Sequence, residues 1–361
     1  MTDRVPAPSA RQPEEVEAFA ESAHPLCARY DVALLDLDGV VYVGDGPVPG
    51  APAALTEARR RGMRLAFVTN NAARPASAVA TRLAGMGVAA DPIDVITSAQ
   101  TAAHYLADRL PPGSAVLVVG GAGLVEALHE RGLRPVASAD DDPAAVVQGF
   151  APATDWAMLS EGAVAIGRGV PWIATNTDST VPSDRGPLPG NGSLVAALRE
   201  ATGYEPTVTG KPQPTMHRET LERTGAVTPL VVGDRLDTDI EGAHAVGCPS
   251  LLVLSGVTDI HTLLAAAPGQ RPTYLGRDVS ALLHAHPATT LDRASSRCGR
   301  WQATARPAGI ELAAAAADEA AGADGLDAVR ALAAQAWAHA TGNLSAADPD
   351  ARAELGRLGL D

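Results

Sequence analysis

Short apolar runs alternate with stretches of helical periodicity from Asp31 onward, and this pattern predicts a parallel sheet covered by helices. The first apolar run, Val32 to Leu37, leads into an irregular Gly- and Pro-containing stretch and then into a helix that ends at Gly62. The next predicted strand is RLAFVTNN, and later apolar runs end at Gly120, Phe150, Asn176, Gly233 and Leu254. The predicted fold class is therefore α/β, with a doubly wound parallel sheet.

Two breaks in this pattern predict an inserted domain. One break lies near Ser98, and the other is the Pro- and Gly-rich stretch VPSDRGPLPGNG with the following TGYEPTVTGKPQP. The roughly one hundred residues between them are enough for a second domain. We therefore expect an N-terminal tail over residues 1–28, a core over 29–97 and 206–286, and an inserted α/β domain over 98–205.

The composition changes beyond His286, where the sequence becomes rich in alanine and poor in β-branched residues. Residues 287–361 are expected to form a helical or mixed extension. One stretch predicts a helix with a single apolar stripe, which should dock onto another surface. The stripe consists of Leu326, Val329, Leu332, Ala333, Ala336 and Trp337.

Composition and charge narrow the choice of partners and location. The 361 residues carry a net charge of -14 and are 46% apolar. An acidic chain does not favour nucleic acid, which needs a basic surface, so we expect a small-molecule ligand. The N-terminus has no hydrophobic signal and no stretch is apolar enough to span a bilayer, so no membrane association is expected. Three scattered cysteines without CxxC spacing suggest a reducing, cytoplasmic location.

The segment LLDLDGVVY carries the first candidate chemistry. An apolar strand runs into Asp36 and Asp38 and is then broken by Gly39. Strand alternation predicts that both carboxylates lie on one side at the carboxyl end of the strand, where α/β sheets bind ligands. Two close anions favour a hard cation such as Mg²⁺. The alternative is an Asp that only caps the next turn.

The segment FVTNN ends a second apolar strand in Thr69, Asn70 and Asn71, before a helix expected to begin near Pro75. A hydroxyl, two amides and backbone N–H groups at such a junction can hold phosphoryl oxygens. Alternatively, Asn71 only caps the helix or makes a turn.

Two later segments add a cation and further acids. Lys211 in VTGKPQP lies in a loop, where its ammonium group can neutralise a phosphoryl transition state or simply remain solvated. In LVVGDRLDTDIEGAHAVG, Asp234 ends an apolar strand and is followed by Asp237 and Asp239, which can complete a Mg²⁺ shell or cap the next helix. All four segments lie at strand ends or in adjoining loops, so we expect them to converge on one crevice.

In this order and spacing, DLDGVVY, TNN, GKP and GDRLDTDI resemble the four motifs of haloacid dehalogenase (HAD) phosphatases over about residues 30–283. More narrowly they look like the capped IIA subfamily of nitrophenylphosphatases, phosphoglycolate phosphatases and glycerol phosphate phosphatases. The resemblance implies a HAD Rossmann-like core, with residues 98–205 as its cap. The cap segments GFAPATDW and TNTDSTVPSDRGPLPGNGS look like those of the subfamily, and the second is expected to help select the substrate.

The resemblance also assigns roles to individual residues. Asp36 is the implied nucleophile and Asp38 the implied general acid and base. Asp36, the backbone carbonyl of Asp38 and Asp234 are implied Mg²⁺ ligands, with Asp239 in a supporting place and Lys211 steadying the phosphoryl group. The implied substrate-binding residues are Thr69, Asn70, Asn71 and Gly39. Many relatives have a small hydroxyl residue where this chain has Ala72.

The implied activity is hydrolysis of a small phosphate ester through an aspartyl phosphate. An acidic chain with a C-terminal module looks similar to actinobacterial glycerol 3-phosphate phosphatases, so glycerol 3-phosphate is the expected substrate. Phosphoglycolate, nucleoside monophosphates or a broad range that includes nitrophenyl phosphate are the alternatives. A homodimer is compatible with the resemblance, because caps of this size often contribute dimer contacts.

Three readings from other functional classes compete with hydrolysis. A response-regulator receiver also uses strand-end acids, but its acid pair precedes the phosphorylated Asp and it has no hundred-residue insertion. A regulatory relative without activity is disfavoured because all the expected catalytic side chains are present. A phosphotransferase needs an acceptor pocket, which sequence does not reveal.

Overall fold

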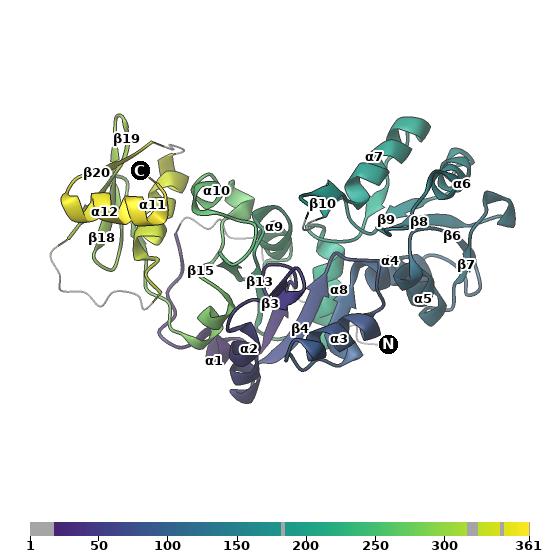
Figure 1. The fold of residues 1–361 in the computed structure, drawn as a ribbon, viewed down its shortest axis with the longest axis horizontal. Helices are drawn as coiled ribbons and strands as arrows, with labels where there is room; N and C mark the ends of the chain where they lie inside the picture. Colours follow the sequence, from purple (N-terminus) through teal and green to yellow (C-terminus); the bar gives the residue numbers. More distant parts are fainter. Residues whose placement is uncertain (1–17, 182–184, 316–323, 340–342, 361) are drawn as a thin grey trace, which may run out of the picture. The chain divides into compact units, whose positions relative to one another are not determined.

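The computed structural model describes residues 18–181, 185–315, 324–339 and 343–360. The chain forms two compact units (Figure 1). The first consists of Met1–Ala33, Ala53–Arg64 and Val227–Asp361, and the second of Leu34–Pro52 and Leu65–Ala226. Among the described helices, none has the length and apolar character needed to cross a membrane.

A six-stranded sheet with the order β15-β14-β13-β1-β4-β5 confirms the predicted α/β class. β13 pairs in parallel with β14, β14 with β15, and β4 with β5. The order reverses at β1, and such a switch point is where open α/β sheets bind ligands at their carboxyl ends. The strands are β1 (Val32–Leu35), β4 (Arg64–Thr69), β5 (Val95–Thr97), β13 (Pro229–Gly233), β14 (Ser250–Val253) and β15 (Tyr274–Gly276).

Short helices accompany these strands. The N-cap of α3 is Pro75, so this helix begins where the sequence predicted it. Likewise α2 ends at Arg60, two residues before the predicted stop at Gly62. The helices are α1 (Leu26–Arg29), α2 (Ala51–Arg60), α3 (Ala76–Gly85), η1 (Pro92–Asp94), α8 (Pro214–Thr224), η3 (Leu236–Ile240), α9 (Glu241–Ala245), α10 (Ile260–Leu264), η4 (Pro268–Gln270) and η5 (Val279–Leu283).

The second unit contains a further five-stranded parallel sheet, with the order β12-β9-β8-β6-β7. One of its apolar clusters includes side chains of α4 and α5, and the other includes side chains of α6 and α7. Helices therefore cover both faces of this sheet (Figure 1). Its strands are β6 (Ala115–Val119), β7 (Arg134–Val136), β8 (Ala145–Gln148), β9 (Trp172–Ala174) and β12 (Thr207–Val208). Its helices are α4 (Ser98–Ala107), α5 (Ala122–Glu130), η2 (Ala139–Asp141), α6 (Trp156–Gly167) and α7 (Asn191–Thr202).

Two small hairpins complete this unit. β2 (Tyr42–Val43) pairs with β3 (Gly46–Pro47) directly after the first acidic motif. β10 (Thr180–Val181) pairs with β11 (Leu188–Pro189) within the predicted substrate-selecting loop, of which residues 182–184 lie outside the described residues.

The C-terminal extension is a mixed structure built on a five-stranded sheet, which confirms its mixed character. β16 to β19 are antiparallel, and β19 pairs in parallel with β20. The elements are β16 (Thr290–Leu291), β17 (Ser295–Cys298), β18 (Trp301–Arg306), β19 (Gly309–Ala314), α11 (Asp327–His339), β20 (Leu344–Ala346) and α12 (Pro349–Leu358).

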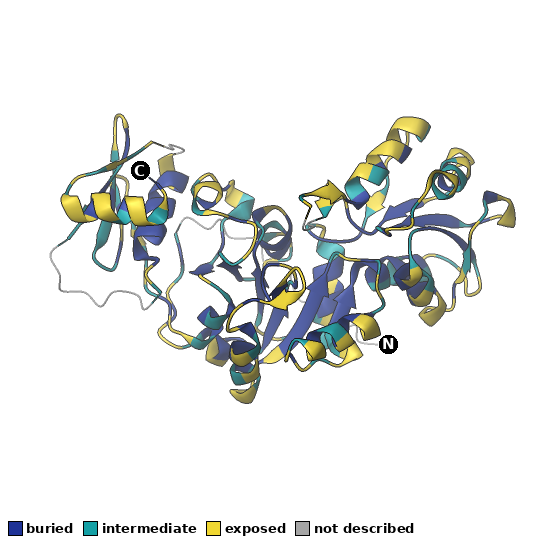
Figure 2. Cartoon of the chain, viewed as in Figure 1, coloured by how far each residue is buried: buried dark blue, intermediate teal, exposed yellow. Residues whose placement is uncertain are grey.

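Helix α11 is buried on more than the single stripe that the sequence predicted. Every residue from Asp327 to Trp337 is buried (Figure 2). Val329, Ala333 and Trp337 join an apolar cluster with Leu252 and Leu275 of the six-stranded sheet. A second cluster lies on the other side, where residues of α11 such as Ala328 and Leu332 pack with the C-terminal sheet. Alanine is frequent here because a helix packed on two sides needs small side chains.

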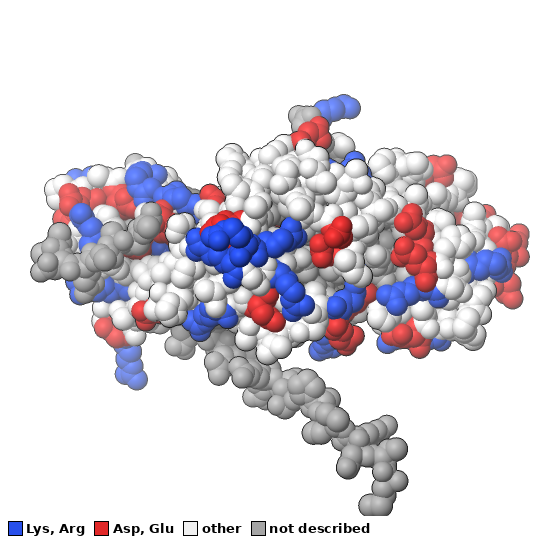
Figure 3. Space-filling view, turned by 90° about the horizontal axis from the view of Figure 1, so that it is seen from below, with Lys and Arg blue, Asp and Glu red and all other residues white. Residues whose placement is uncertain are grey.

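Charged side chains of both signs occur along the face shown in Figure 3. On α2, for example, Arg60 and Arg61 both pair with the carboxylate of Glu57. Such exposed pairs contribute little to stability.

Candidate active site

The nucleophile candidate Asp36 follows β1 directly, and the chain then folds back on itself. The backbone N–H groups of Val41 and Tyr42 donate to the carbonyl of Leu37, at 2.9 and 3.1 Å. Gly39 has φ +82° and donates its N–H to Tyr42, so the glycine that ends the motif supplies the left-handed conformation of the turn. This turn holds Asp36 at the end of the strand.

Lys211 forms a buried ion pair with Asp36. Its Nζ lies 2.5 Å from Asp36 Oδ1 and 3.3 Å from the carbonyl of Val68, and the lysine side chain is 3% exposed. The backbone at Gly210 is so close to Thr175 that an added Cβ would lie 2.2 Å from the Thr175 carbonyl. The lysine is therefore held against the carboxylate rather than solvated in its loop.

Asn70 connects the second motif with the third and with the loop after β9. Its Oδ1 accepts from the Lys211 N–H at 2.9 Å, and its Nδ2 donates to the Lys211 carbonyl at 3.1 Å. The same Nδ2 lies 3.2 Å from Asp178 Oδ2, and the Asn70 carbonyl accepts from Ser98 and Asn176. In this structure the amide of Asn70 thus positions the lysine loop.

The side chains of Thr69 and Asn71, on either side of Asn70, make local hydrogen bonds. The hydroxyl oxygen of Thr69 accepts from the Asn71 N–H at 3.1 Å and is buried at the end of β4. The carboxamide of Asn71 accepts from the Ala73 N–H at 2.9 Å, which is the local turn that the sequence left open as an alternative.

Asp234 and Asp239 are buried in the first unit, where backbone donors hold them. Val257 donates its N–H to Asp234 Oδ2 at 2.6 Å, and Arg235 donates its N–H to Asp239 Oδ2 at 3.1 Å. A Cβ at Gly256 would lie 1.9 Å from Asp234 Oδ2, so only glycine allows this close approach. Asp237, by contrast, is exposed and pairs with the guanidinium of Arg235.

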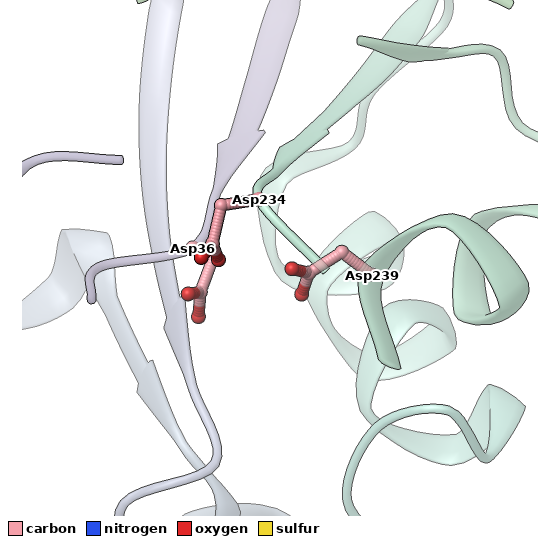
Figure 4. Close-up of side chains that lie close together, drawn as sticks. All are labelled: Asp36, Asp234 and Asp239. Atoms are coloured by element: carbon pink, nitrogen blue, oxygen red, sulfur yellow. The ribbon is translucent and has the colours of Figure 1, made fainter. Parts of the chain in front are cut away.

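The carboxylates of Asp36, Asp234 and Asp239 form the one metal-ligand cluster found among the described residues (Figure 4). One oxygen from each lies within 4.8 Å of the other two. Three carboxylates this close repel one another, and oxygen ligands are those that Mg²⁺ prefers. The donor set therefore fits a hard divalent cation, which would supply positive charge for phosphoryl oxygens.

Asp38 is exposed to solvent, unlike Asp234 and Asp239, although the surrounding protein still desolvates its carboxyl group in part. This desolvation raises the pKa of its carboxyl, whereas the positive charges of Arg82 and Lys211 oppose the rise. A carboxyl with a raised pKa retains its proton at higher pH, which suits a general acid. Burial also raises the pKa of Tyr42, and the negative charge of Asp38 adds to the rise.

Sequence reasoning missed several residues of this site. Asp178 was quoted within TNTDST but received no role of its own, although it contacts Asn70. Tyr42 was quoted within DLDGVVY, and Arg82, which stacks on it, carried no signal because it lies on a helix forty residues away. Gly256 and Val257 follow an apolar run, a position that marks them as strand-end residues.

Two segments of the chain match known hydrolase families. Residues 33–134 match the family described as haloacid dehalogenase-like hydrolase, and residues 208–282 match a HAD-hydrolase-like family. Residues 298–360 match a GCN5-related N-acetyltransferase like domain. This last match covers β18, β19 and β20 of the C-terminal sheet and the helices α11 and α12. Of β17 it includes only Cys298.

Curated relatives cover most of the chain. A D-glycerol 3-phosphate phosphatase of Mycobacterium tuberculosis is 44% identical over 351 residues, which are 93% of this chain and 96% of the relative. An acid sugar phosphatase of Staphylococcus aureus is 33% identical over 254 residues, which are 70% of this chain and 96% of the relative.

Solved structures of phosphatases are also similar to this chain. A glycerol phosphate phosphatase from Mycobacterium tuberculosis in complex with magnesium has a TM-score of 0.86 at 43% identity, covering 95% of this chain and 100% of that one. A p-nitrophenyl phosphatase from Archaeoglobus fulgidus has a TM-score of 0.66 at 29% identity, covering 70% and 98%. The four motifs, the geometry and these matches together show that the chain belongs to the haloacid dehalogenase-like hydrolase family.

Proposed function

We propose that this chain is a Mg²⁺-dependent phosphatase that hydrolyses a small phosphate ester through an aspartyl phosphate on Asp36. The observation that carries the proposal is the buried pair of Asp36 and Lys211, with the carboxylates of Asp234 and Asp239 close to Asp36. In such a set the ammonium group offsets the charge of the nucleophile, and the carboxylates provide oxygen ligands for a metal ion. The relatives that cover most of the chain are named phosphatases.

The reaction proceeds in two displacements. A carboxylate oxygen of Asp36 attacks phosphorus, the P–O bond to the alcohol breaks, and Asp38 gives its proton to the leaving oxygen. Asp38 then takes a proton from water, whose oxygen attacks the phosphorus of the aspartyl phosphate and releases inorganic phosphate. Lys211 stabilises the negative charge of the phosphoryl group in both steps. Asp36, Asp234 and the Asp38 carbonyl would hold Mg²⁺, supported by Asp239.

Thr69, Asn70, Asn71 and Gly39 are proposed to surround the transferring phosphoryl group. In the structure the Asn70 amide binds the Lys211 backbone, so its contribution is to set the position of the lysine. The hydroxyl of Thr69 lies at the end of β4, next to Asn70. Backbone N–H groups at such a strand end are suited to phosphate oxygens.

The proposed substrate is glycerol 3-phosphate. It is supported by the relative named D-glycerol 3-phosphate phosphatase, which shares 44% identity and matches this chain from core to C-terminal module. Phosphoglycolate and a broad range of phosphomonoesters remain the alternatives, because other relatives and neighbours are named acid sugar phosphatase and p-nitrophenyl phosphatase.

The proposed organisation keeps the core at residues 29–97 and 206–286, with residues 98–205 as the cap. The structure gives the cap region a sheet of its own, which β12 also joins. A cytoplasmic location and a homodimer complete the proposal. The three cysteines that motivate the location are unpaired in the structure.

The test is phosphate release from purified protein with Mg²⁺ and four substrates: glycerol 3-phosphate, phosphoglycolate, a nucleoside monophosphate and nitrophenyl phosphate. We expect the highest kcat/KM for glycerol 3-phosphate and loss of release after chelation of the metal. A higher kcat/KM for another ester would replace the substrate. No release from any of them, with or without metal, would contradict the phosphatase proposal.

A further inference from the structure

Asp178 lies in the loop that follows β9, and its backbone is fixed on both sides. Its N–H donates to Asn176 Oδ1 at 3.1 Å, and its carbonyl accepts from the Gly192 N–H at 2.9 Å. A Cβ at Gly190 would lie 2.3 Å from the Asp178 carbonyl oxygen, so only glycine allows the chain to pass this close. The side chain of Asp178 is half-buried and starts from a well-defined position.

The carboxylate of Asp178 completes the hydrogen bonds of the Asn70 amide. The Nδ2 group of Asn70 carries two hydrogens, and it donates to the Lys211 carbonyl at 3.1 Å and to Asp178 Oδ2 at 3.2 Å. Its Oδ1 accepts from the Lys211 N–H at 2.9 Å. A flipped amide would point its oxygen at the carboxylate, which cannot donate. Asp178 therefore favours the one orientation of Asn70 that binds both backbone groups of Lys211.

The position of this backbone decides where the lysine ammonium group lies. The Lys211 side chain is 3% exposed, and its Nζ lies 2.5 Å from Asp36 Oδ1. The preceding residue, Gly210, has no room for a side chain, because a Cβ would lie 2.7 Å from Asn70 Oδ1 and 2.2 Å from the Thr175 carbonyl. Such placement matters for catalysis, since a displacement of ~1 Å can cost ~10²-fold in rate.

The backbone of Asn70 is held by the same loop. Asn176 is 3% exposed, and its Nδ2 donates to the Asn70 carbonyl at 2.7 Å, where the Ser98 hydroxyl also donates at 2.6 Å. Asn191 in turn donates its Nδ2 to the Asn176 carbonyl at 2.7 Å. All these residues belong to the second compact unit. Both the main chain and the side chain of Asn70 are therefore fixed from the proposed cap.

We propose that Asp178 is a positioning residue: its carboxylate orients the Asn70 amide, and this amide holds the Lys211 backbone so that the ammonium group lies against Asp36. The inference rests on the proposed phosphatase function and adds to it a cap residue that acts through Asn70 rather than on the substrate. What the position requires is a hydrogen-bond acceptor. A neutral acceptor of the same size therefore replaces the carboxylate, and an apolar side chain does not.

The test compares Asp178→Leu and Asp178→Asn with the unchanged enzyme, on glycerol 3-phosphate and on nitrophenyl phosphate with Mg²⁺. Asp178→Leu keeps the size and removes the acceptor, so we expect kcat/KM to fall by ~10-fold or more. The fall should be the same for both esters, because Lys211 stabilises the phosphoryl group that they share. Asp178→Asn keeps an acceptor oxygen and should stay within ~3-fold of the unchanged enzyme.

A double-mutant cycle with Asn70→Ala provides a readout that a merely structural role would not give. If Asp178 acts through Asn70, Asp178→Leu should cause no further loss, within ~3-fold, in a protein that already carries Asn70→Ala. Losses from two independent sites would multiply instead. Nitrophenyl phosphate is the substrate for the cycle, because its coloured product allows low rates to be measured.

Asp155→Leu is the matched control. Asp155 is another aspartate of the proposed cap, and its carboxylate accepts from the Met158 N–H at 2.9 Å at the start of α6. This variant should leave kcat/KM unchanged for both esters. If Asp178→Leu proves unstable in thermal unfolding, Asp178→Ala takes its place in the same cycle.

Four results would overturn the role of Asp178. They are full activity of Asp178→Leu, an equal loss in Asp178→Asn, multiplied losses in the cycle, and a loss confined to glycerol 3-phosphate. The last would mean that Asp178 contacts the alcohol part of the substrate. Failure of the unchanged enzyme to release phosphate would instead overturn the proposed function.

Discussion

Lys211 and Arg330 are both buried cations paired with aspartates, yet their surroundings differ. Lys211 binds Asp36, whose carboxylate lies close to two further carboxylates, Asp234 and Asp239. Arg330 in α11 binds Asp324 and Asp327 and donates its remaining Nη2 hydrogen bond to a backbone carbonyl. The first cluster gathers three carboxylates around one ammonium group, whereas in the second the guanidinium lies between two carboxylates and its hydrogen bonds are closed within the protein.

This difference distinguishes a candidate catalytic site, the Lys211 cluster, from a structural ion-pair cluster, that of Arg330. Three carboxylates close together provide oxygen ligands for a metal ion, and such an ion can take part in catalysis. A closed pair gains little in stability over apolar packing, but loss of one partner is costly because the other charge stays buried. Despite desolvation, which lowers it, the hydrogen bonds to Asp324 raise the pKa of Arg330.

Asp36→Asn should produce the largest effect, on activity alone. Removal of a catalytic nucleophile typically costs on the order of 10⁵- to 10⁶-fold in kcat. Folding should be kept, because the amide is isosteric and Asp234 and Asp239 stay in the cluster. Steady-state phosphate release and thermal unfolding measure the two properties. Steady hydrolysis by a folded Asp36→Asn protein, at more than a trace of the normal rate, would remove Asp36 from its role.

A chain that ends at Ala288 should lose its fold as well as its activity. It lacks α11 and so exposes the cluster around Leu252 and Leu275 that Leu326, Val329 and Trp337 cover. Each large apolar side chain that loses its burial costs ~1.5–3 kcal/mol. Soluble yield, circular dichroism and turnover are the measurements. A shortened protein with normal turnover and unfolding temperature would show that the C-terminal module is an appendage.

Arg330→Met should destabilise the protein by ~3–5 kcal/mol, because Asp327 stays buried without its cation. The folded fraction should keep its kcat, which is the reverse of Asp36→Asn. Arg357→Met is the control, since Arg357 pairs with Glu354 at the surface and should cost only ~0–1 kcal/mol. Urea unfolding followed by tryptophan fluorescence gives both values. Equal costs for the two variants would contradict the buried role of Arg330.

Added Mg²⁺ should stabilise the folded chain through the first cluster. A ligand at ~100 times its Kd contributes ~2.7 kcal/mol if it binds only the folded state. Asp234→Asn should abolish this gain, and Asp237→Asn should keep it, because Asp237 is exposed and pairs with Arg235. Unfolding temperatures at several metal concentrations provide the measurement. A gain that survives Asp234→Asn would place the metal elsewhere.

The smallest effect concerns pH. Burial, and secondly the charge of Lys211, lower the pKa of His217 to about 3. The unfolded chain binds this proton below pH ~6.5, so stability is fully present above that pH and declines by up to ~1.4 kcal/mol per unit as the pH falls. His217→Leu should flatten the decline between pH 6.5 and 5. The slope of stability against pH in His286→Leu is the comparison, because burial, and after it the charge of Arg330, also lower the pKa of His286. An unchanged slope in His217→Leu would show that another group titrates.

The sheet of the core and the convergence of the candidate site residues were readable from the sequence because apolar runs end where the polar motifs begin. Asp36, Thr69 and Asp234 each follow such a run, and parallel strands bring their carboxyl ends to one edge. The ion pair of Lys211 with Asp36 joins residues far apart in sequence, so the loop position of Lys211 did not identify the carboxylate with which it pairs.

Contacts between distant segments limited the rest of the prediction. Strands β17 and β19, SSRC and GIELAA, are short and nearly lack β-branched residues, so propensity alone does not identify them. All six residues of the stripe expected for α11 are buried, but they do not share one surface: Leu332 and Ala336 pack in the cluster of the C-terminal sheet, with Ala328 and Ala331. The sequence did not reveal that sheet. The stacking of Arg82 on Tyr42 leaves no trace in periodicity.

The most direct test of the central claim is identification of the residue that is phosphorylated during turnover. Enzyme mixed with Mg²⁺ and nitrophenyl phosphate should be quenched in acid and reduced with borohydride, which converts an aspartyl phosphate into homoserine. Mass spectrometry of peptides should then find homoserine at position 36, and none when the substrate is omitted or in Asp36→Asn. Modification at Asp234 or another residue, or none despite a burst of product, would contradict the assignment of Asp36.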